Sequence, residues 1–100
     1  MDTNGEARDV AERASCKLLE LRASLSPSIA DVAAIASEVR VPSGSEFSSH
    51  ATANKARAET WLAIRKVVRT LEGNPGAKDL DAFWGRAFDQ TKIWLQAIDG

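Results

Sequence analysis

The chain has 100 residues, of which 44% are apolar and only three are prolines, so it holds enough material for one small folded domain. Thirteen basic and fourteen acidic residues give a formal net charge of −1, without the overall positive field typical of nucleic-acid-binding domains. A single cysteine excludes an internal disulfide, and one cysteine with one histidine cannot supply a metal site by themselves.

The first predicted helix begins near residue 4 and carries one apolar stripe. The segment Thr3-Asn4-Gly5-Glu6 fits a capping box, in which the threonine oxygen accepts from the Glu6 amide and the glutamate reaches back. We expect the helix to end near Ser26-Pro27, because proline disfavours helical geometry in the residue before it. Apolar residues at intervals of three and four form the stripe: Ala7, Val10, Ala11, Ala14, Leu18, Leu21 and Leu25.

A shorter second helix is predicted directly after Pro27. Ser28 stands three residues before Asp31, a spacing typical of an N-cap serine followed by an acidic first turn. Its stripe is Ile29, Val32, Ala33, Ala36 and Val39.

The polar stretch VRVPSGSEFSSHAT, residues 39–52, separates the two helical halves. Its centre, Gly44-Ser45-Glu46-Phe47, is the in-frame translation of two adjoining cloning-site hexamers, GGATCC and GAATTC. Loops that join helices in a bundle usually have about two to eight residues, and this stretch is longer. Two interpretations stay open, namely a natural Gly/Ser loop and an engineered linker between two binding partners.

Helical periodicity resumes at about Ala51 and continues to near Glu72, where Gly73 and Pro75 signal a stop. Trp61 borders the apolar face of this third helix, and Leu62 points away from it. The face itself comprises Ala56, Thr60, Ala63, Ile64, Val67, Val68 and Leu71.

Asp79 is the predicted N-cap of the last helix, which has the widest apolar face in the chain. Ile93 lies opposite this face. The residues of the apolar face follow a 4-3-4-3-4 spacing: Leu80, Trp84, Ala87, Thr91, Trp94 and Ile98. Phe83, Phe88 and Leu95 lie beside them.

No segment alternates with period two, so the predicted fold class is all-α. We expect a four-helix bundle made of two helical hairpins, residues 1–43 and 51–100, joined by a flexible linker at 44–50. Two helices hide only part of two apolar stripes, so each hairpin is the expected cover of the other. The predicted core and partner interface is formed by Leu18, Leu21, Leu25, Ile29, Val32, Trp61, Ile64, Val68, Phe83, Trp84, Phe88 and Trp94.

No residue pattern indicates catalysis. Asp79 and Asp81 lie at a helix start, where carboxylates complement the helix dipole, so capping explains them better than acid-base chemistry. His50 has no nucleophile or acid partner spaced for a triad, and Cys16 falls away from the main stripe of its helix. We therefore expect no catalytic residue, no cofactor, no metal and no small-molecule ligand.

The segment SIADVAAIASEV resembles the first helix of the helix-turn-helix in the LacI repressor family. The likeness ends at Ser37-Glu38-Val39, where that family has a tight Gly-Val-Ser turn, and no recognition helix follows at once. Basic residues on the third helix, Lys55, Arg57, Arg65, Lys66 and Arg69, are more simply explained as a solvated face. The residues that match the family pattern are Ile29, Asp31, Val32, Ala33 and Ala36.

The layout of two hairpins, the Gly44–Phe47 linker and the Ala/Arg/Asp-rich character together resemble a docking-domain pair of modular polyketide synthases, in the four-helix-bundle class of trans-acyltransferase assembly lines. That resemblance implies a hairpin of one subunit packing against a hairpin of the next. Joining a C-terminal tail to an N-terminal head makes residues 1–43 the more natural upstream piece. No functional residue is transferred by it, since no signature motif is shared.

From these observations we expect a non-catalytic protein-protein docking module whose partners are the two hairpins themselves. The alternatives are a small helix-turn-helix-like DNA-binding regulator and a natural single-chain adaptor or inhibitor protein. The first residues show no signal peptide, and no apolar run reaches the roughly 18 residues of a membrane span, so a cytoplasmic location and no membrane partner are expected.

Overall fold

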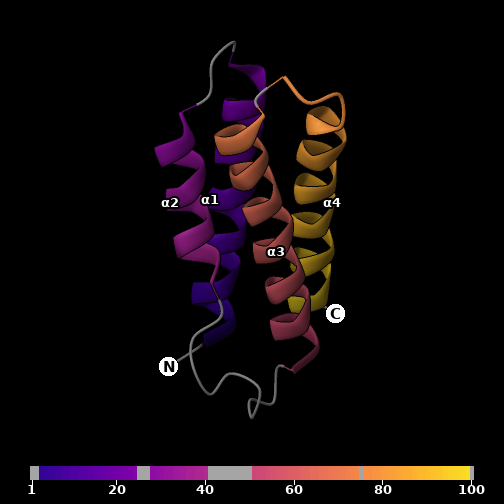
Figure 1. Cartoon of the computed structure of the whole chain (residues 1–100). Helices are drawn as coiled ribbons and strands as arrows, with labels where there is room; N and C mark the ends of the chain where they lie inside the picture. The colour runs from indigo at the N-terminus through magenta and orange to yellow at the C-terminus, as the bar shows by residue number, and fades with distance from the viewer. Residues whose placement is uncertain (1–2, 25–27, 41–50, 75, 100) are drawn as a thin grey trace.

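A computed structural model describes residues 3–24, 28–40, 51–74 and 76–99 of the chain. Within those ranges the secondary structure consists of four helices and no strand: α1 (Thr3–Ala23), α2 (Ile29–Val39), α3 (Ala51–Gly73) and α4 (Leu80–Asp99). Consecutive helices run up and down, side by side, so the start of α1 and the end of α4 lie at the same end of the molecule (Figure 1). The predicted all-α four-helix bundle is confirmed.

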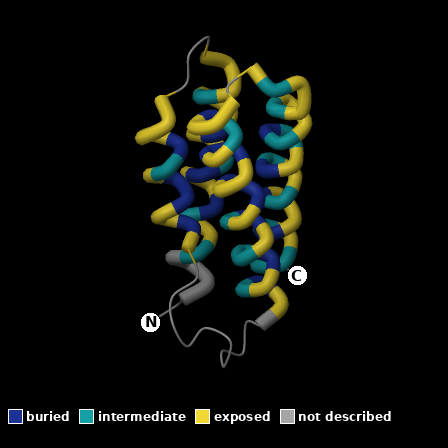
Figure 2. Tube along the Cα trace, in the orientation of Figure 1, coloured by how far each residue is buried: buried dark blue, intermediate teal, exposed yellow. Residues whose placement is uncertain are grey.

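The four helices form a closed square in chain order. α1 lies next to α2 and α4, and α3 lies next to α2 and α4, whereas the backbones of the diagonal pairs are farther apart. The resulting rod measures 41 × 21 × 20 Å. Buried positions of each helix face the inside of the square and exposed positions face outward (Figure 2), as expected for amphipathic helices in a bundle.

The ends of the helices follow local hydrogen-bond chemistry. Ser28 has the extended backbone of an N-cap, with φ −72° and ψ 127°, and its Oγ accepts from the Asp31 amide at 3.4 Å, so this predicted cap is confirmed. α1 ends at Ala23, a few residues before the predicted stop, and the Ser24 amide donates to the Leu21 carbonyl at 3.1 Å, which tightens the last turn. The side chains of the predicted capping box at 3–6 lie outside the described set.

The core contains the centre of every predicted stripe. Two threonines on these stripes, Thr60 and Thr91, are fully buried. Their hydroxyls donate to the carbonyls four residues earlier, Ala56 at 2.9 Å and Ala87 at 2.8 Å, so their burial leaves no hydroxyl without a partner. The largest fully buried side chains are Trp94, Leu18, Ile64, Val32, Val39, Val67, Thr60 and Thr91.

One residue predicted to lie in the core is exposed. Ile29 is 38% exposed, because it is the first residue of α2 and lies at the end of the bundle. Ile35, which the predicted stripe omitted, is buried at 4% exposure and continues the three-and-four spacing of Val32, Ala36 and Val39. The buried face of α2 is therefore rotated slightly from the predicted one.

Trp84 is 5% exposed at the centre of the α4 stripe, and replacing it with alanine removes a large ring from the core. We expect Trp84→Ala to lower the free energy of unfolding by about 3 to 5 kcal/mol, a large share of what a domain of this size possesses. Thermal denaturation followed by circular dichroism measures the loss.

Ile93→Lys is the matched control on the same helix, since Ile93 is 48% exposed. Its free energy of unfolding should change by less than about 0.5 kcal/mol. A Trp84→Ala melting temperature within a few degrees of the parent would contradict the placement of Trp84 in the core.

Candidate interface between the two helical hairpins

The contacts between helices are unequal around the square. The α3–α4 contact is the most extensive, and the α1–α2 contact is the least extensive. Each helix of the first hairpin makes a larger contact with the second hairpin, α1 with α4 and α2 with α3, than with its own neighbour. The first hairpin is thus held more by the second hairpin than by itself.

The predicted interface residues fall into four groups, namely half-buried, exposed, outside the described residues, and buried. Leu21, Trp61, Phe83 and Phe88 are half-buried at the edges of the core, and Ile29 is exposed as described above. Leu25 lies outside the described residues. The residues that the structure brings together in the buried core are Leu18, Val32, Ile64, Val68, Trp84 and Trp94.

Arg57 of α3 joins the two hairpins by polar contacts. Its Nε donates to the Val39 carbonyl at 2.6 Å, and its Nη2 donates to the Glu38 carbonyl at 3.0 Å. The same guanidinium lies over the ring of Trp94, with its Cζ 5.2 Å from the ring centroid. One side chain therefore links the C-terminus of α2 to both helices of the second hairpin.

These bonds satisfy carbonyls that a helix end leaves without intrahelical partners. The Arg40 amide donates to the Ala36 carbonyl at 3.0 Å, and the Arg57 side chain donates to the carbonyls of Glu38 and Val39. A positive charge at a helix C-terminus also complements the helix dipole. Burial lowers the pKa of Arg57 from its usual value, yet an arginine stays charged at neutral pH, so the interaction persists there.

Arg57 is the main interface residue that the sequence pattern does not reveal, because it stands among the basic residues of a predicted solvated face. Lys55, Arg65, Lys66 and Arg69 are indeed exposed, but Arg57 is half-buried. The available signal was its position, directly after Ala56 and three residues before Thr60, at the edge of the apolar stripe. Its partners, backbone carbonyls 18 and 19 residues away, carry no sequence signal.

A second polar link lies toward the other end of the bundle. Arg22 Nη2 donates to Asp81 Oδ1 at 3.0 Å, joining the last turn of α1 to the first turn of α4. The two side chains are 41% and 82% exposed, so solvent screening makes this ion pair worth little. The pair aligns the last turn of α1 with the first turn of α4. Each charge also lies at the helix end whose dipole it complements.

Half-buried aromatic rings at the edges of the core are covered by basic side chains. Lys66 Nζ lies 5.2 Å from the Phe83 centroid, and Lys92 Nζ lies 4.7 Å from that of Phe88. The Arg65 guanidinium lies 5.9 Å from the Trp61 centroid. These basic residues place their stems on apolar surface and their charges in water.

The arrangement of α2 and α3 differs from a helix-turn-helix. These helices lie side by side in the bundle (Figure 1), whereas a helix-turn-helix sets its two helices at about 90 to 120° across a turn of three or four residues. Residues 40–50 separate them, and the structure describes only residue 40 of that segment. The LacI-like spacing of α2 is used here for packing against α1 and α3.

Metal-binding clusters and membrane-spanning helices are both absent from the described part of the chain. No group of three or more His, Cys, Asp or Glu side chains there could hold a metal ion, and no described helix is long and apolar enough to cross a membrane. Cys16 is an exposed free thiol, and His50 lies outside the described residues. Comparisons with protein-family profiles, curated proteins and solved structures found no match for this chain. The two family resemblances therefore remain predictions.

Replacing Arg57 with methionine keeps most of the apolar stem but removes both hydrogen bonds to α2. We expect Arg57→Met to lower the free energy of unfolding by about 1 to 3 kcal/mol, because two carbonyls and the helix dipole lose their partner. Arg57→Lys should be less destabilised than Arg57→Met but more than the parent, since one ammonium group cannot reproduce the two spaced N–H donors of the guanidinium. Urea denaturation of both variants gives the values.

Arg65→Met is the matched control, because Arg65 is exposed on the same helix and its recorded contact is with Trp61, one turn earlier. A change below about 0.5 kcal/mol is expected there. Equal effects at both positions would show that the bonds to Glu38 and Val39 contribute no stability of their own.

Proposed function

We propose that this chain is a non-catalytic docking module in which the first hairpin, α1–α2, and the second hairpin, α3–α4, recognise one another. The observation that carries the proposal is the imbalance of contacts, since α1 and α2 each meet the second hairpin more extensively than they meet each other. A hairpin whose two helices cover little of each other needs another surface to bury its apolar stripes, and the second hairpin supplies it. The bundle core is then the interface.

Apolar burial supplies the affinity of this interface. Leu18 and Val32 from the first hairpin and Ile64, Trp84 and Trp94 from the second belong to one buried cluster. Burying apolar surface contributes about 25 cal/mol per Å², and large aromatic side chains dominate such interfaces. A stripe of this kind tolerates related partners, because many apolar surfaces of similar shape can cover it.

Arg57 supplies the discrimination. Its two donors need the carbonyls of Glu38 and Val39 at the end of α2, and its guanidinium is half-buried against Trp94. A partner helix that ended one turn earlier or later would leave the guanidinium without acceptors in a partly desolvated place, which costs free energy. The match between the end of α2 and Arg57 therefore selects the register of the partner.

The setting that this arrangement suits is subunit association in a cytoplasmic multienzyme assembly line such as a polyketide synthase. A docking pair decides which subunit receives the growing product, and it needs specificity more than high affinity. The linker at 44–50 would raise the effective concentration of the two hairpins to the order of millimolar, enough to saturate a micromolar complex. This setting requires that the linker joins two pieces that are separate in nature; a natural loop would instead favour the single-chain adaptor.

The test begins from the folded chain, cut at a protease site placed within residues 44–47. We expect the two pieces to stay associated as a one-to-one complex with a dissociation constant of roughly 1 μM, near −8 kcal/mol, because the recognition surface lies in the helices. Isothermal titration of the separated pieces measures this value. The isolated first piece should be mostly unfolded and gain helix on mixing, while the second keeps more of its own, since α3–α4 is the most extensive contact.

A piece carrying Arg57→Met provides the control for specificity, because its apolar stripe is unchanged. Its affinity should fall about tenfold or more while the helicity of the second piece alone stays the same. Absence of heat and of helix gain at about 100 μM would refute docking, and would leave a single-chain bundle whose halves fold only together.

A further inference from the structure

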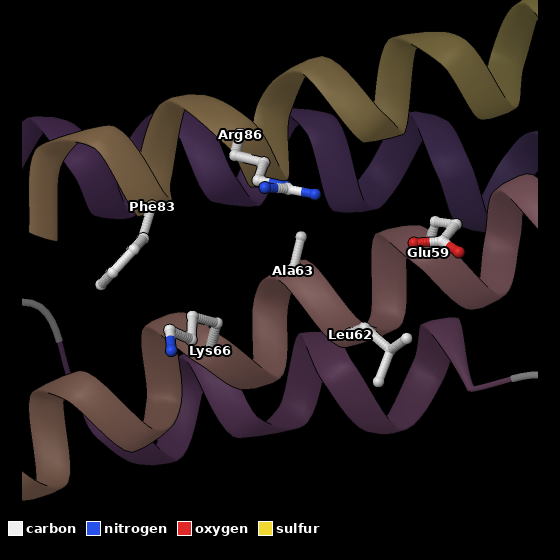
Figure 3. A pocket seen from close by; sticks show the side chains of 6 residues that line it. All are labelled: Glu59, Leu62, Ala63, Lys66, Phe83 and Arg86. Carbon is white, nitrogen blue, oxygen red and sulfur yellow. The ribbon is translucent and has the colours of Figure 1, made fainter. Parts of the chain in front are cut away.

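Two grooves lie on opposite outer faces of the bundle. The first runs between α3 and α4, has a volume of about 270 Å³ and is lined by Glu59, Leu62, Ala63, Lys66, Phe83 and Arg86. Figure 3 shows Arg86 reaching from α4 and Ala63 from α3 into the space between these helices. The second groove runs between α1 and α2, with adjoining hollows of about 350 and 320 Å³. Since the helices follow one another around a square, these faces point in opposite directions.

The two grooves have opposite charge. Among the described side chains that line the α3–α4 groove, Lys66 and Arg86 are basic and Glu59 is acidic. The residues lining the α1–α2 groove include two basic side chains, Arg13 and Lys17, and a larger acidic set. That acidic set is Glu12, Glu20, Asp31 and Glu38.

Apolar surface accompanies the charges. Leu62 is 54% exposed and lines the α3–α4 groove, as does the half-buried ring of Phe83. The α1–α2 groove contains Leu21 and Ala34 between its acidic residues. A leucine that projects from one groove and an apolar floor in the other are complementary in kind, as in the apolar centre and polar rim of transient interfaces.

We propose that the α3–α4 groove of one molecule binds the α1–α2 groove of a second copy. A second copy is the occupant that charge complementarity favours, because each molecule carries both the basic and the acidic groove. The two surfaces are different, so the contact is heterologous, and it leaves one free groove at each end of every pair. Such a contact extends into head-to-tail chains of copies and does not close into a dimer.

This inference is independent of the proposed pairing of hairpins, because it concerns the outer faces of the intact bundle. In a multienzyme setting, such chains would align many docking modules side by side. The contact should be weak and sensitive to salt, since its grooves are small and its charges are exposed.

Sedimentation velocity on the intact chain, at protein concentrations from about 10 μM to 1 mM, tests the proposal. The average mass should rise continuously above the monomer value of 10.8 kDa and should fall again when salt is raised from about 50 to 500 mM. A mass that remains at the monomer value, or one that stops rising at twice that value, would overturn the proposal.

Two double variants each neutralise the charges of one groove. Lys66→Gln with Arg86→Gln neutralises the basic groove, and Glu20→Gln with Glu38→Gln neutralises much of the acidic one. Each should weaken self-association about tenfold or more. Arg65→Gln with Lys92→Gln is the control, because it removes the same two positive charges from exposed residues outside the α3–α4 groove, and it should leave chain growth unchanged. Melting curves confirm that all three variants are folded.

Mixing the two groove variants gives the decisive measurement. Each retains the groove that the other lacks, so the mixture should form a one-to-one pair that does not grow further. Self-association lost in only one of the two variants would indicate a symmetric dimer through one face and would refute the head-to-tail contact.

Discussion

The structure depends on the inability of α1 and α2 to cover each other. α2 has 11 residues and α1 has 21, so at 1.5 Å per residue they are about 16 and 31 Å long, and α1 extends well past its neighbour. The apolar stripe of α1 runs along most of this helix, with Ala7, Val10, Ala11, Ala14, Leu18 and Leu21 in or against the core. A cover must come from elsewhere, and α4 supplies it. The first half of the chain therefore has no complete core without the second half.

Apolar packing and polar contacts have different roles in this arrangement. The buried cluster makes association of the halves favourable, but a stripe of alanine, valine and leucine would accept a helix shifted by one turn at modest cost. The two hydrogen bonds from the Arg57 guanidinium would be lost on such a shift, because their acceptors are the carbonyls at the very end of α2. A sparse polar contact at the edge of an apolar interface thus fixes the alignment that the apolar surface alone leaves loose.

The sequence was sufficient for the fold because helix periodicity is a local signal. The stripes around Leu18, Ile64 and Trp84 are visible in the spacing of residues, and so is the Ser28 cap. It was less informative for α2, where Ile29 and Ile35 lie on opposite sides of the stripe formed by Val32, Ala36 and Val39, and the spacing alone does not decide toward which side the buried face is rotated. It could not reveal the role of Arg57, whose partners are main-chain atoms. Backbone carbonyls are the same at every residue, so no side-chain pattern records which helix end faces which arginine.

The linker and the interface can be separated in physical terms. The end of α2 and the start of α3 lie at the same end of the bundle (Figure 1), and Arg57, in the second turn of α3, already holds the last carbonyls of α2. The geometry of this junction is thus fixed by contacts between α2 and α3, and the segment 40–50 need only be long enough to connect them. A tether of this kind changes the concentration at which the halves meet and leaves their contacts unchanged. Under the proposed docking function, selection on partner choice would therefore act on Arg57 and on the end of α2, and would leave the composition of the connecting segment free to vary.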